Sequence, residues 1–311
     1  MRVLITGGNG FIGSHLVDQA LLAGWDVSVY DKADEKFRGR QDGVHYLRGD
    51  LQTDGVPQEA LSGQDVVFHL ACSTIHKTSN DDPVFDIQSN VVSTVKLLQQ
   101  CVAAEVKRFV FLSSGGTVYG IPQKLPVTES HSTNPICSYG IQKLAIEKYL
   151  GMFHHLYGLD YLALRPSNPY GERQDFRQEQ GAVTVFLGKL ALGEPITIWG
   201  DGETVRDYFY VEDLARACLD AATKKLERRV LNISSGVGLS LNQLLARIED
   251  VLGLKTLVKR NSSSSRPFDV PKLYLDNSQA ERVLSWRPRV TLDEGIVRTW
   301  RWVQSVVGKD S

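Results

Sequence analysis

The sequence predicts an α/β protein: a doubly wound parallel sheet followed by a smaller, mixed C-terminal lobe. In the first half, short apolar segments rich in β-branched residues alternate with longer segments of helical periodicity. After Gly171 this alternation loosens, and polar loops separate shorter elements. We therefore expect a sheet domain at residues 1–165 and a lobe at 166–311, with the option that the chain crosses back between them.

The first element joins a predicted strand to a predicted helix through a glycine-rich turn. Residues 2–6 are apolar, residues 7–13 read GGNGFIG, and helical periodicity follows to residue 23. Glycine permits the tight turn and lets the backbone approach a pyrophosphate, while the helix N-terminus offers N–H groups to the anion. This Rossmann-like pattern predicts a dinucleotide contact at Gly7, Gly10, Phe11, Ile12 and Gly13.

The second predicted strand, residues 26–30, ends in a carboxylate. Asp31 lies 18 residues after Gly13, where an acidic side chain hydrogen-bonds the adenosine ribose hydroxyls. A carboxylate there also repels a 2′-phosphate, so the sequence favours NAD over NADP. The adjacent Lys32 softens this preference slightly.

The alternation then continues through three further strands and a helix. We expect strands at 45–48, 65–71 and 108–112, and a helix at 90–104. We interpret His69, inside the second of these strands, as a packing residue. Ligands of such sheets bind at the carboxyl ends of the strands. The segment SSGGTVYG at 113–120 and the segment after a strand at 161–164 both follow such ends.

A tyrosine and a lysine four residues apart introduce the candidate chemistry. The residues that follow them, 144–150, read as helix, so Tyr139 and Lys143 are expected to share one helical face. A phenol ordinarily loses its proton near pH 10, and a lysine cation nearby favours the phenolate. Lowering the pKa by about 3 units takes about 4 kcal/mol, part of which a cationic nicotinamide would supply. The pair predicts a general acid/base beside a dinucleotide; the alternative is an exposed helical Tyr and Lys.

The second half has shorter predicted elements. We expect a helix at 183–192, strands at 195–199 and 205–211, and a helix from residue 212. The serine-rich residues 261–265 indicate a loop.

Composition excludes several classes of function. The 311 residues carry a formal net charge of -1 and no long basic run, so nucleic acid and anionic membrane surfaces are not expected partners. No apolar run approaches the roughly 20 residues that span a bilayer. The four cysteines form no CxxC pair and the histidines no HExxH pattern. We expect a cytoplasmic protein with reduced cysteines and no metal.

Together these motifs resemble the extended short-chain dehydrogenase/reductase superfamily, in its nucleotide-sugar epimerase/dehydratase branch. The resemblance covers nearly the whole chain. It implies that Tyr139 is the catalytic base and that Lys143 assists it and holds the nicotinamide ribose. It also implies further NAD contacts at Asp50, Leu51, Leu70, Ala71, Asn90, Ser113 and Pro166.

The same resemblance implies the binding of a UDP-sugar by the C-terminal lobe. Arg206 and Arg266 would grip the diphosphate, which suits the fork of donors on a guanidinium. Asp269 would bind the uridine ribose, and Asn168 the sugar or phosphate. Further contacts with phosphate and uracil would come from Gln180, Ala182, Val183 and Trp199.

Within this branch the sequence is most similar to UDP-glucose and UDP-N-acetylglucosamine 4-epimerases. Dehydratases and decarboxylases carry an acidic residue two or three positions before the tyrosine of the VYG segment, and here those positions hold Gly116 and Thr117. The family usually has Ser or Thr at the position of Gly115. We expect Thr117, and after it Ser114, to supply the missing hydroxyl; a water is the alternative.

Three matters stay open at this point. Leu273 occupies a position where a tyrosine would close the sugar pocket to N-acetyl groups, and the alternative is simple packing. Other readings of the function are another nucleotide-sugar epimerase or ketoreductase, or a non-catalytic dinucleotide-binding regulator. We expect a homodimer built through a four-helix bundle of helices 90–104 and 140–157, unless their apolar faces are buried within one chain.

Overall fold

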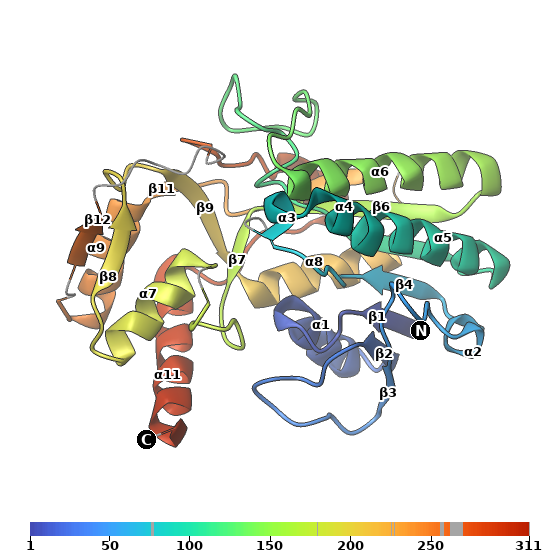
Figure 1. Cartoon of the computed structure of the whole chain (residues 1–311), viewed down its shortest axis with the longest axis horizontal. Helices are drawn as coiled ribbons and strands as arrows, with labels where there is room; N and C mark the ends of the chain where they lie inside the picture. Colours follow the sequence, from blue (N-terminus) through green and yellow to red (C-terminus); the bar gives the residue numbers. More distant parts are fainter. Residues whose placement is uncertain are drawn as a thin grey trace.

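A computed structural model describes residues 1–75, 78–178, 180–224, 226, 228–255, 258–261 and 270–310 (Figure 1). Its centre is a seven-stranded parallel sheet in the order β10-β6-β5-β4-β1-β2-β3, which confirms the predicted fold class. The strands are β1 (Arg2–Thr6), β2 (Asp26–Asp31), β3 (Val44–Arg48), β4 (Val66–His69), β5 (Arg108–Leu112), β6 (Asp160–Pro166) and β10 (Val230–Ile233).

Helices cover both faces of this sheet because its central strands are apolar on both sides. Along β1, Val3 and Ile5 pack towards α1 (Phe11–Leu22) and α8 (Val211–Thr223), whereas Leu4 packs on the opposite face. That opposite face carries α2 (Gln58–Leu61), α5 (Ser93–Ala103) and α6 (Ser138–Tyr157). Two buried cores therefore flank one sheet.

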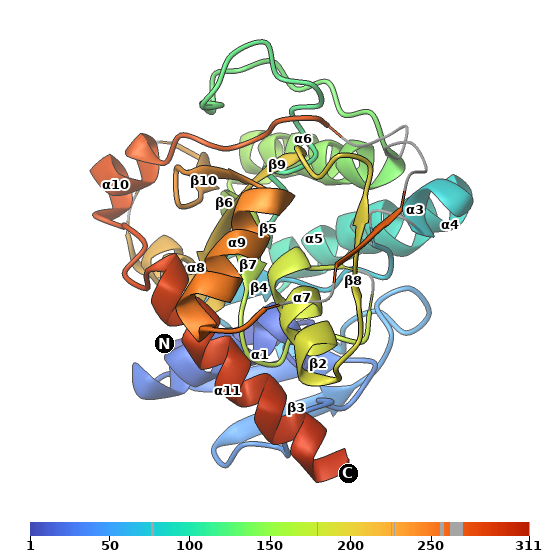
Figure 2. The same ribbon diagram turned by 90° about the vertical axis from the view of Figure 1, so that its left-hand side faces the viewer.

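The smaller lobe contains two short sheets and the remaining long helices (Figure 2). A three-stranded sheet is formed by β7 (Asn168–Tyr170), β9 (Val205–Tyr210) and β11 (Gly238–Ser240), and a two-stranded one by β8 (Ile196–Trp199) and β12 (Val258–Asn261). The helices are α7 (Ala182–Ala191), α9 (Leu241–Leu252) and α11 (Leu292–Asp310), and the core of the lobe includes Tyr170, Phe176, Ile198 and Ile248. A further helix, α10 (Ser278–Leu284), packs instead on the large sheet against β10 and α8.

The chain crosses back between the lobes, the option that the sequence left open, because β10 joins the edge of the large sheet beside β6. Other elements differ from the sequence-based expectation. The strand expected at 65–71 ends at His69, so Leu70 and Ala71 follow it as loop. The helix expected at 90–104 is preceded by α3 (Thr78–Asp81) and α4 (Pro83–Asp86) and opens with a π-helical segment, η1 (Ile87–Val92).

Two further expectations concern the loop and the membrane. Of the serine-rich residues expected as a loop, Asn261 ends β12 and 262–265 lie outside the described residues. Among the described helices, none is long and apolar enough to cross a bilayer.

Candidate active site

The glycine turn after β1 forms a cradle that only glycine fits. Gly7 has a positive φ of 76°, and a Cβ added there would lie 2.6 Å from the backbone nitrogen of Ala71. A Cβ at Gly13 would lie 2.1 Å from the Gly7 carbonyl oxygen. Gly10 caps α1 without a side-chain hydrogen bond, and the first turn of α1 holds no acidic residue. The open N–H groups at Phe11, Ile12 and Gly13 therefore suit an anion such as a pyrophosphate.

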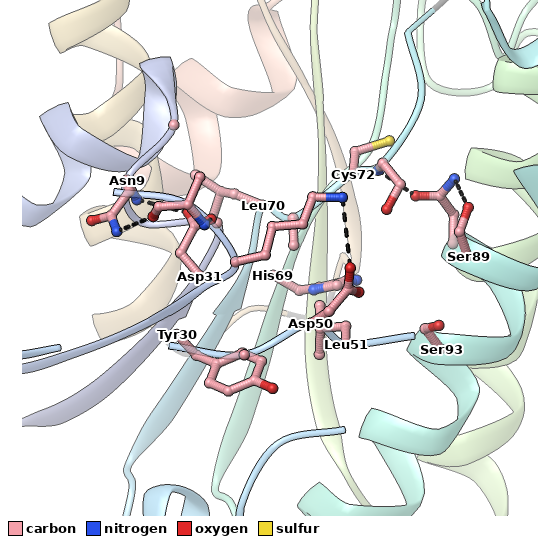
Figure 3. A pocket seen from close by; sticks show the side chains of 18 of the residues that line it. Asn9, Tyr30, Asp31, Asp50, Leu51, His69, Leu70, Cys72, Ser89 and Ser93 are labelled. Carbon is pink, nitrogen blue, oxygen red and sulfur yellow. Dashed lines mark hydrogen bonds and ion pairs between the residues drawn. The ribbon is translucent and has the colours of Figure 1, made fainter. Parts of the chain in front are cut away.

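Asp31 lies at the carboxyl end of β2, beside this cradle (Figure 3). Its Oδ2 accepts a 3.0 Å hydrogen bond from the Asn9 backbone, and its Oδ1 one of 3.1 Å from Ala33. Burial raises the pKa of Asp31, against the opposing effect of these hydrogen bonds and of Lys32. The Lys32 Nζ lies 3.7 Å from Asp50, so its charge is directed partly away from Asp31.

A cleft of about 230 Å³ runs from Asp31 towards Cys72 and Ser89 (Figure 3). It brings together nine of the residues predicted to bind the cofactor: Gly7, Gly10, Asp31, Lys32, Asp50, Leu51, Leu70, Ala71 and Asn90. Phe11, Ile12, Gly13, Ser113, Tyr139, Lys143 and Pro166 do not line it. The cleft extends along the carboxyl ends of β1, β2 and β4, which is where a doubly wound sheet binds a dinucleotide.

Sequence reasoning missed other residues of this cleft. They are Asn9, Tyr30, Ala33, Gly49, His69, Cys72, Ser73, Ser89, Ser93 and Thr94. Most adjoin a predicted residue, and Ser93 and Thr94 lie one helical turn after Asn90, so helical periodicity would have found them. His69 is buried as expected; its ring nitrogens lie 2.7 Å from Thr6 Oγ1 and 2.8 Å from Thr94 Oγ1. Burial lowers its pKa to about 3, which keeps the ring neutral.

Asn90 lines the cleft, but its amide group bonds the protein. Its Oδ1 accepts from the Ser73 backbone at 2.9 Å, and its Nδ2 donates to Thr74 Oγ1 at 3.1 Å and to Asp86 Oδ1 at 3.0 Å. The side chain therefore fixes the loop after β4, which forms one wall of the cleft.

Tyr139 and Lys143 lie on the first turns of α6, on one face as predicted. The Lys143 Nζ is 5.5 Å from the Tyr139 ring centroid and donates a 3.0 Å hydrogen bond to the Leu112 carbonyl at the end of β5. Lys143 is buried and Tyr139 is half-buried. Next to them, Gln142 of the same helix donates to the Cys72 sulfur at 3.5 Å, which links the pair to the wall of the cleft.

The surroundings of Tyr139 favour its protonated phenol. Burial raises its pKa well above 10, and negative charge on Cys72, Cys137 or Asp86 would raise it further. The Lys143 cation, 5.5 Å from the ring centroid, favours the phenolate instead. A further positive charge bound beside the phenol would lower its pKa in the same direction.

The segment from residue 113 to 120 packs beside this tyrosine. A Cβ added at Gly140 would lie 2.8 Å from the Thr117 carbonyl oxygen, so Thr117 adjoins the residue that follows Tyr139. The Thr117 Oγ1 is buried and has no hydrogen-bond partner within the part of the chain that the structure describes. The Ser114 carbonyl accepts from the backbone nitrogens of Thr117 and Val118, which closes the turn. An unpaired buried hydroxyl at this place is free to bond a ligand or a water.

Ser113 turns away from the cleft. Its hydroxyl donates to Glu147 of α6 at 2.5 Å, and Glu147 forms a buried ion pair with Arg165 at 2.5 Å. Arg165 also donates to the Tyr119 hydroxyl at 2.9 Å. These bonds fix α6, the end of β6 and the 113–120 segment relative to one another. Pro166 holds the same segment by accepting from the Gly115 backbone at 2.9 Å.

Two of the predicted substrate residues lie where the lobes meet. Asn168, on β7, donates to the Asp207 carbonyl at 3.0 Å. On β9, the Arg206 guanidinium donates to the carbonyls of Val205 and Val270 at 2.8 and 2.6 Å. The neighbouring Asp207 is fully buried and accepts from Ser235 at 2.6 Å, and burial raises its pKa. The position of Arg206 is thus set by the segment that precedes Leu273.

The N-terminus of α7 supplies backbone rather than side-chain groups. Gly181 caps it with φ of 96° and no side-chain hydrogen bond, and its first turn holds no acidic residue. Val183 is buried in the core and Gln180 is exposed. The N–H groups of Ala182 and Val183 are therefore the polar atoms that this turn offers to an anion.

Of the four other residues of the lobe that were predicted to bind the substrate, the structure describes the side chain of one. Leu273 is buried in a small cluster with Val118, Tyr119, Val127 and Leu275. Trp199 ends β8, and its side chain is outside what the structure describes. Arg266 and Asp269 lie outside the described residues.

Two further features bear on chemistry. All four cysteines are within the described residues and are free. Within the described ranges, no three His, Cys, Asp or Glu side chains gather as metal ligands would.

Residues 3–234 match the model of the NAD dependent epimerase/dehydratase family. The chain is 35% identical over 308 residues to a putative UDP-glucose 4-epimerase of Methanocaldococcus jannaschii, covering 97% of this chain and 98% of that one. It superposes on the UDP-glucose 4-epimerase of Thermotoga maritima, solved with UDP-glucose, with a TM-score of 0.91, 35% identity and coverage of 99% and 100%. For the UDP-N-acetylglucosamine 4-epimerase of Methanobrevibacter ruminantium, in complex with UDP-N-acetylmuramic acid, the TM-score is 0.90, with 33% identity and 98% of each chain covered.

Proposed function

This chain belongs to the NAD-dependent epimerase/dehydratase family, and we propose that it inverts C4 of a UDP-hexose through a transient 4-keto sugar. The observation that carries this proposal is the composition of the surroundings of Tyr139. The 113–117 segment beside it offers hydroxyls and no carboxylate. The nearby Asp86 is fully buried, with both carboxylate oxygens bonded within the protein. Without an acid for chemistry beyond C4, reversible oxidation at C4 is the simplest reaction the site supports.

The residues present fit NAD, because the glycine cradle excludes side chains where a pyrophosphate would approach and Asp31 lines the cleft at the end of β2, where a ribose would bind. Bound NAD supplies hydride-transfer chemistry and positive charge. Tyr139 takes the proton of the C4 hydroxyl and later returns it to the oxygen of the 4-keto sugar. Inversion requires the keto sugar to turn over in between, so that the hydride held by the cofactor would add to the opposite face of C4. Lys143 favours the phenolate and is positioned by the Leu112 carbonyl. Thr117 Oγ1 bonds the sugar hydroxyl and orients it towards Tyr139.

The lobe binds the remainder of the substrate. We assign the diphosphate to Arg206 and to the N-terminus of α7 at Ala182 and Val183, which combine a cation with open N–H groups. The similarity to epimerases of both UDP-glucose and UDP-N-acetylglucosamine makes both sugars candidate substrates.

The decisive experiment incubates the purified protein with UDP-glucose and, separately, UDP-N-acetylglucosamine without added cofactor. NMR then follows appearance of the galacto epimers. We expect conversion without added NAD, because a hydride carrier that is regenerated in each turnover can remain bound. The Tyr139→Phe variant should lose about 10²- to 10⁴-fold in turnover and retain UDP binding. Binding of NAD without conversion of any UDP-sugar would favour the regulator alternative.

We also propose that the protein forms a homodimer through α4, η1 and α6. All three elements expose apolar side chains. These are Val84 and Phe85 on α4, Ile87 and Val92 on η1, and Ile141, Tyr149, Met152 and Leu156 on α6. Figure 1 shows these helices side by side on one side of the molecule. Light scattering should give twice the monomer mass for the wild type and the monomer mass for Leu156→Glu. Leu22→Glu, on α1 and 81% exposed, is the control that should leave the dimer intact.

A further inference from the structure

A buried carboxylate that the reaction itself does not use lies between the cofactor cleft and the catalytic helix. Asp86, the last residue of α4, is 0% exposed. Its Oδ1 accepts from Asn90 Nδ2 at 3.0 Å and from the hydroxyl of Thr74. Both of these partners hold the loop after β4, which forms a wall of the cleft. A buried charge is costly unless it is fully hydrogen-bonded, and Asp86 meets that condition.

The other oxygen of the same carboxylate faces the catalytic helix. Asp86 Oδ2 accepts a 2.7 Å hydrogen bond from the hydroxyl of Ser138, the residue before Tyr139. The N-terminus of α6 has no side-chain cap of its own. Instead, Ser79 Oγ accepts from the Tyr139 backbone at 3.1 Å and Asn80 Oδ1 from Ser138 at 3.0 Å. The first turn of α6 is thus held by α3 and by Asp86, on separate elements.

The local backbone suits this arrangement. Asp86 immediately precedes the π-helical segment η1, which contains Asn90. The wider turn is accompanied by a 3.2 Å bond from Ser93 Oγ to the Gln88 carbonyl, five residues back. Single π turns inside helices are frequent at functional sites. Here the turn lies between α4 and α5, where Asp86 and Asn90 meet the cleft wall and the start of α6.

We propose that Asp86 is a positioning residue that couples the cofactor cleft to Tyr139, through Thr74 and Asn90 on one carboxylate oxygen and Ser138 on the other. The inference rests on the proposed function, in which Tyr139 is the base. A ligand that tightens the loop at Thr74 then also fixes the start of α6, and the negative charge of Asp86 opposes premature ionisation of Tyr139.

The ionisable groups acting on Tyr139, among the residues that the structure describes, lie on four elements. Lys143 is one turn further along α6, Cys137 precedes that helix, Cys72 lies on the cleft wall and Asp86 ends α4. Burial is the main cause of the raised pKa of Tyr139, and Asp86 adds to it. Removing the Asp86 charge should therefore lower the pH at which Tyr139 ionises.

The test is Asp86→Asn in the NAD-loaded protein. The asparagine carbonyl can accept from Thr74 and Asn90, and its amide can donate to the Ser138 hydroxyl, so geometry is retained while charge is lost. With tyrosine ring carbons labelled by ¹³C and the Tyr139 signal assigned with Tyr139→Phe, titration should begin at lower pH than in the wild type. The acid limb of turnover should move the same way. If the Asp86→Asn variant folds and its Tyr139 signal titrates at the same pH as in the wild type, the proposal is overturned.

Two variants that each remove one hydrogen bond to Asp86 distinguish a coupling between the two sites from a general loss of stability. Ser138→Ala cuts only the link to α6 and should lower turnover about 10- to 100-fold with NAD affinity retained. Thr74→Val removes the Thr74 hydroxyl from the link to the cleft, leaves the Ser138 bond in place, and should weaken NAD binding about 2- to 10-fold. Equal loss of NAD affinity in both would overturn the proposal, even if Asp86→Asn failed to fold. The NMR and NAD-binding readouts need no UDP-sugar, so they stand if the proposed substrate class is wrong.

Discussion

Leu275 occupies the space that a side chain at position 115 would need. A Cβ built on Gly115 would lie 2.4 Å from Leu275 Cδ1 and 2.9 Å from the Arg165 carbonyl oxygen. A side chain at this position would therefore clash with its neighbours. The Thr117 Oγ1, two residues further on, is buried and has no hydrogen-bond partner among the described residues.

A serine at position 115 should therefore harm the protein. Gly115→Ser should lower the free energy of unfolding by about 1–3 kcal/mol, because overpacking forces the neighbours to shift. Denaturant unfolding measures this. Gly116→Ser is the matched control, since a Cβ there would lie no closer than 3.8 Å to the Ser114 hydroxyl. The double variant Gly115→Ser/Leu275→Ala should be less destabilised by the serine than the wild-type background is, because the Leu275 side chain no longer occupies the space. A Gly115→Ser variant as stable as the wild type would contradict this account.

Thr117→Val should separate activity from stability. The hydroxyl makes no hydrogen bond within the described structure, so its removal costs no protein–protein bond, and stability should change by less than about 1 kcal/mol. Turnover should fall more than in Ser114→Ala. Thermal unfolding and epimerase assays on the two variants measure this split. If Ser114→Ala were the more damaging change, or if neither mattered, water would be the better candidate for this role.

The pH dependence of turnover should follow the ionisation of Tyr139. Burial raises the pKa of Tyr139, and a base must be deprotonated to work, so turnover should rise with pH on the acid side. Lys143→Met removes the opposing cation, 5.5 Å from the ring, and should move this rise to higher pH as well as lower the maximum. A pH–rate profile of both proteins measures the shift. If turnover of both proteins rose over the same pH range, Lys143 would contribute to binding of the cofactor and not to the ionisation of Tyr139.

The sequence predicted those features of the site whose residues are close together along the chain. The glycine turn, Asp31 and the Tyr139–Lys143 pair each lie within one strand–helix junction or one helical turn, so spacing alone identifies them. The placement of β10, the capping of α6 by Ser79 and the filling of Gly115 by Leu275 depend on residues 60 to 160 positions apart in the chain or on packing volumes. Such contacts leave no periodic signal.

Asp31 should make the protein select NAD over NADP. Asp31 lines the cleft, and the adjacent Lys32 pairs with Asp50 at 3.7 Å. The cation beside Asp31 is therefore already engaged and is not directed to a 2′-phosphate. Asp31→Ser should narrow the ratio of the two dissociation constants about tenfold or more, which calorimetric titration of the cofactor-free protein measures. Lys32→Ala is the control and should leave the preference for NAD in place. Tighter binding of NADP by the wild type would refute this reading of Asp31.

The breadth of substrate use turns on Leu273, for which the two interpretations predict different outcomes. As a gate, its modest size admits an N-acetyl group, and Leu273→Tyr should reduce kcat/KM selectively for UDP-N-acetylglucosamine. An apolar pocket discriminates by about 1–3 kcal/mol for each methylene-sized change, so both sugars should be used by the wild type with unequal efficiency. As a packing residue, Leu273 supports Val118 and Tyr119 in their buried cluster, next to Thr117.

Leu273→Tyr also adds volume to a buried site, so a loss of activity in that variant could come from a loss of stability. The smaller side chain of Leu273→Ala provides a second measurement without overpacking. A gate predicts that kcat/KM for the N-acetyl sugar rises relative to UDP-glucose. Packing alone predicts an equal loss for both sugars, with unfolding easier by about 2–5 kcal/mol. The ratio of the two kcat/KM values is insensitive to the amount of folded protein, so it distinguishes a change in the pocket from a loss of stability. A ratio unchanged in both variants would leave Leu273 as part of the core that supports the 113–120 segment.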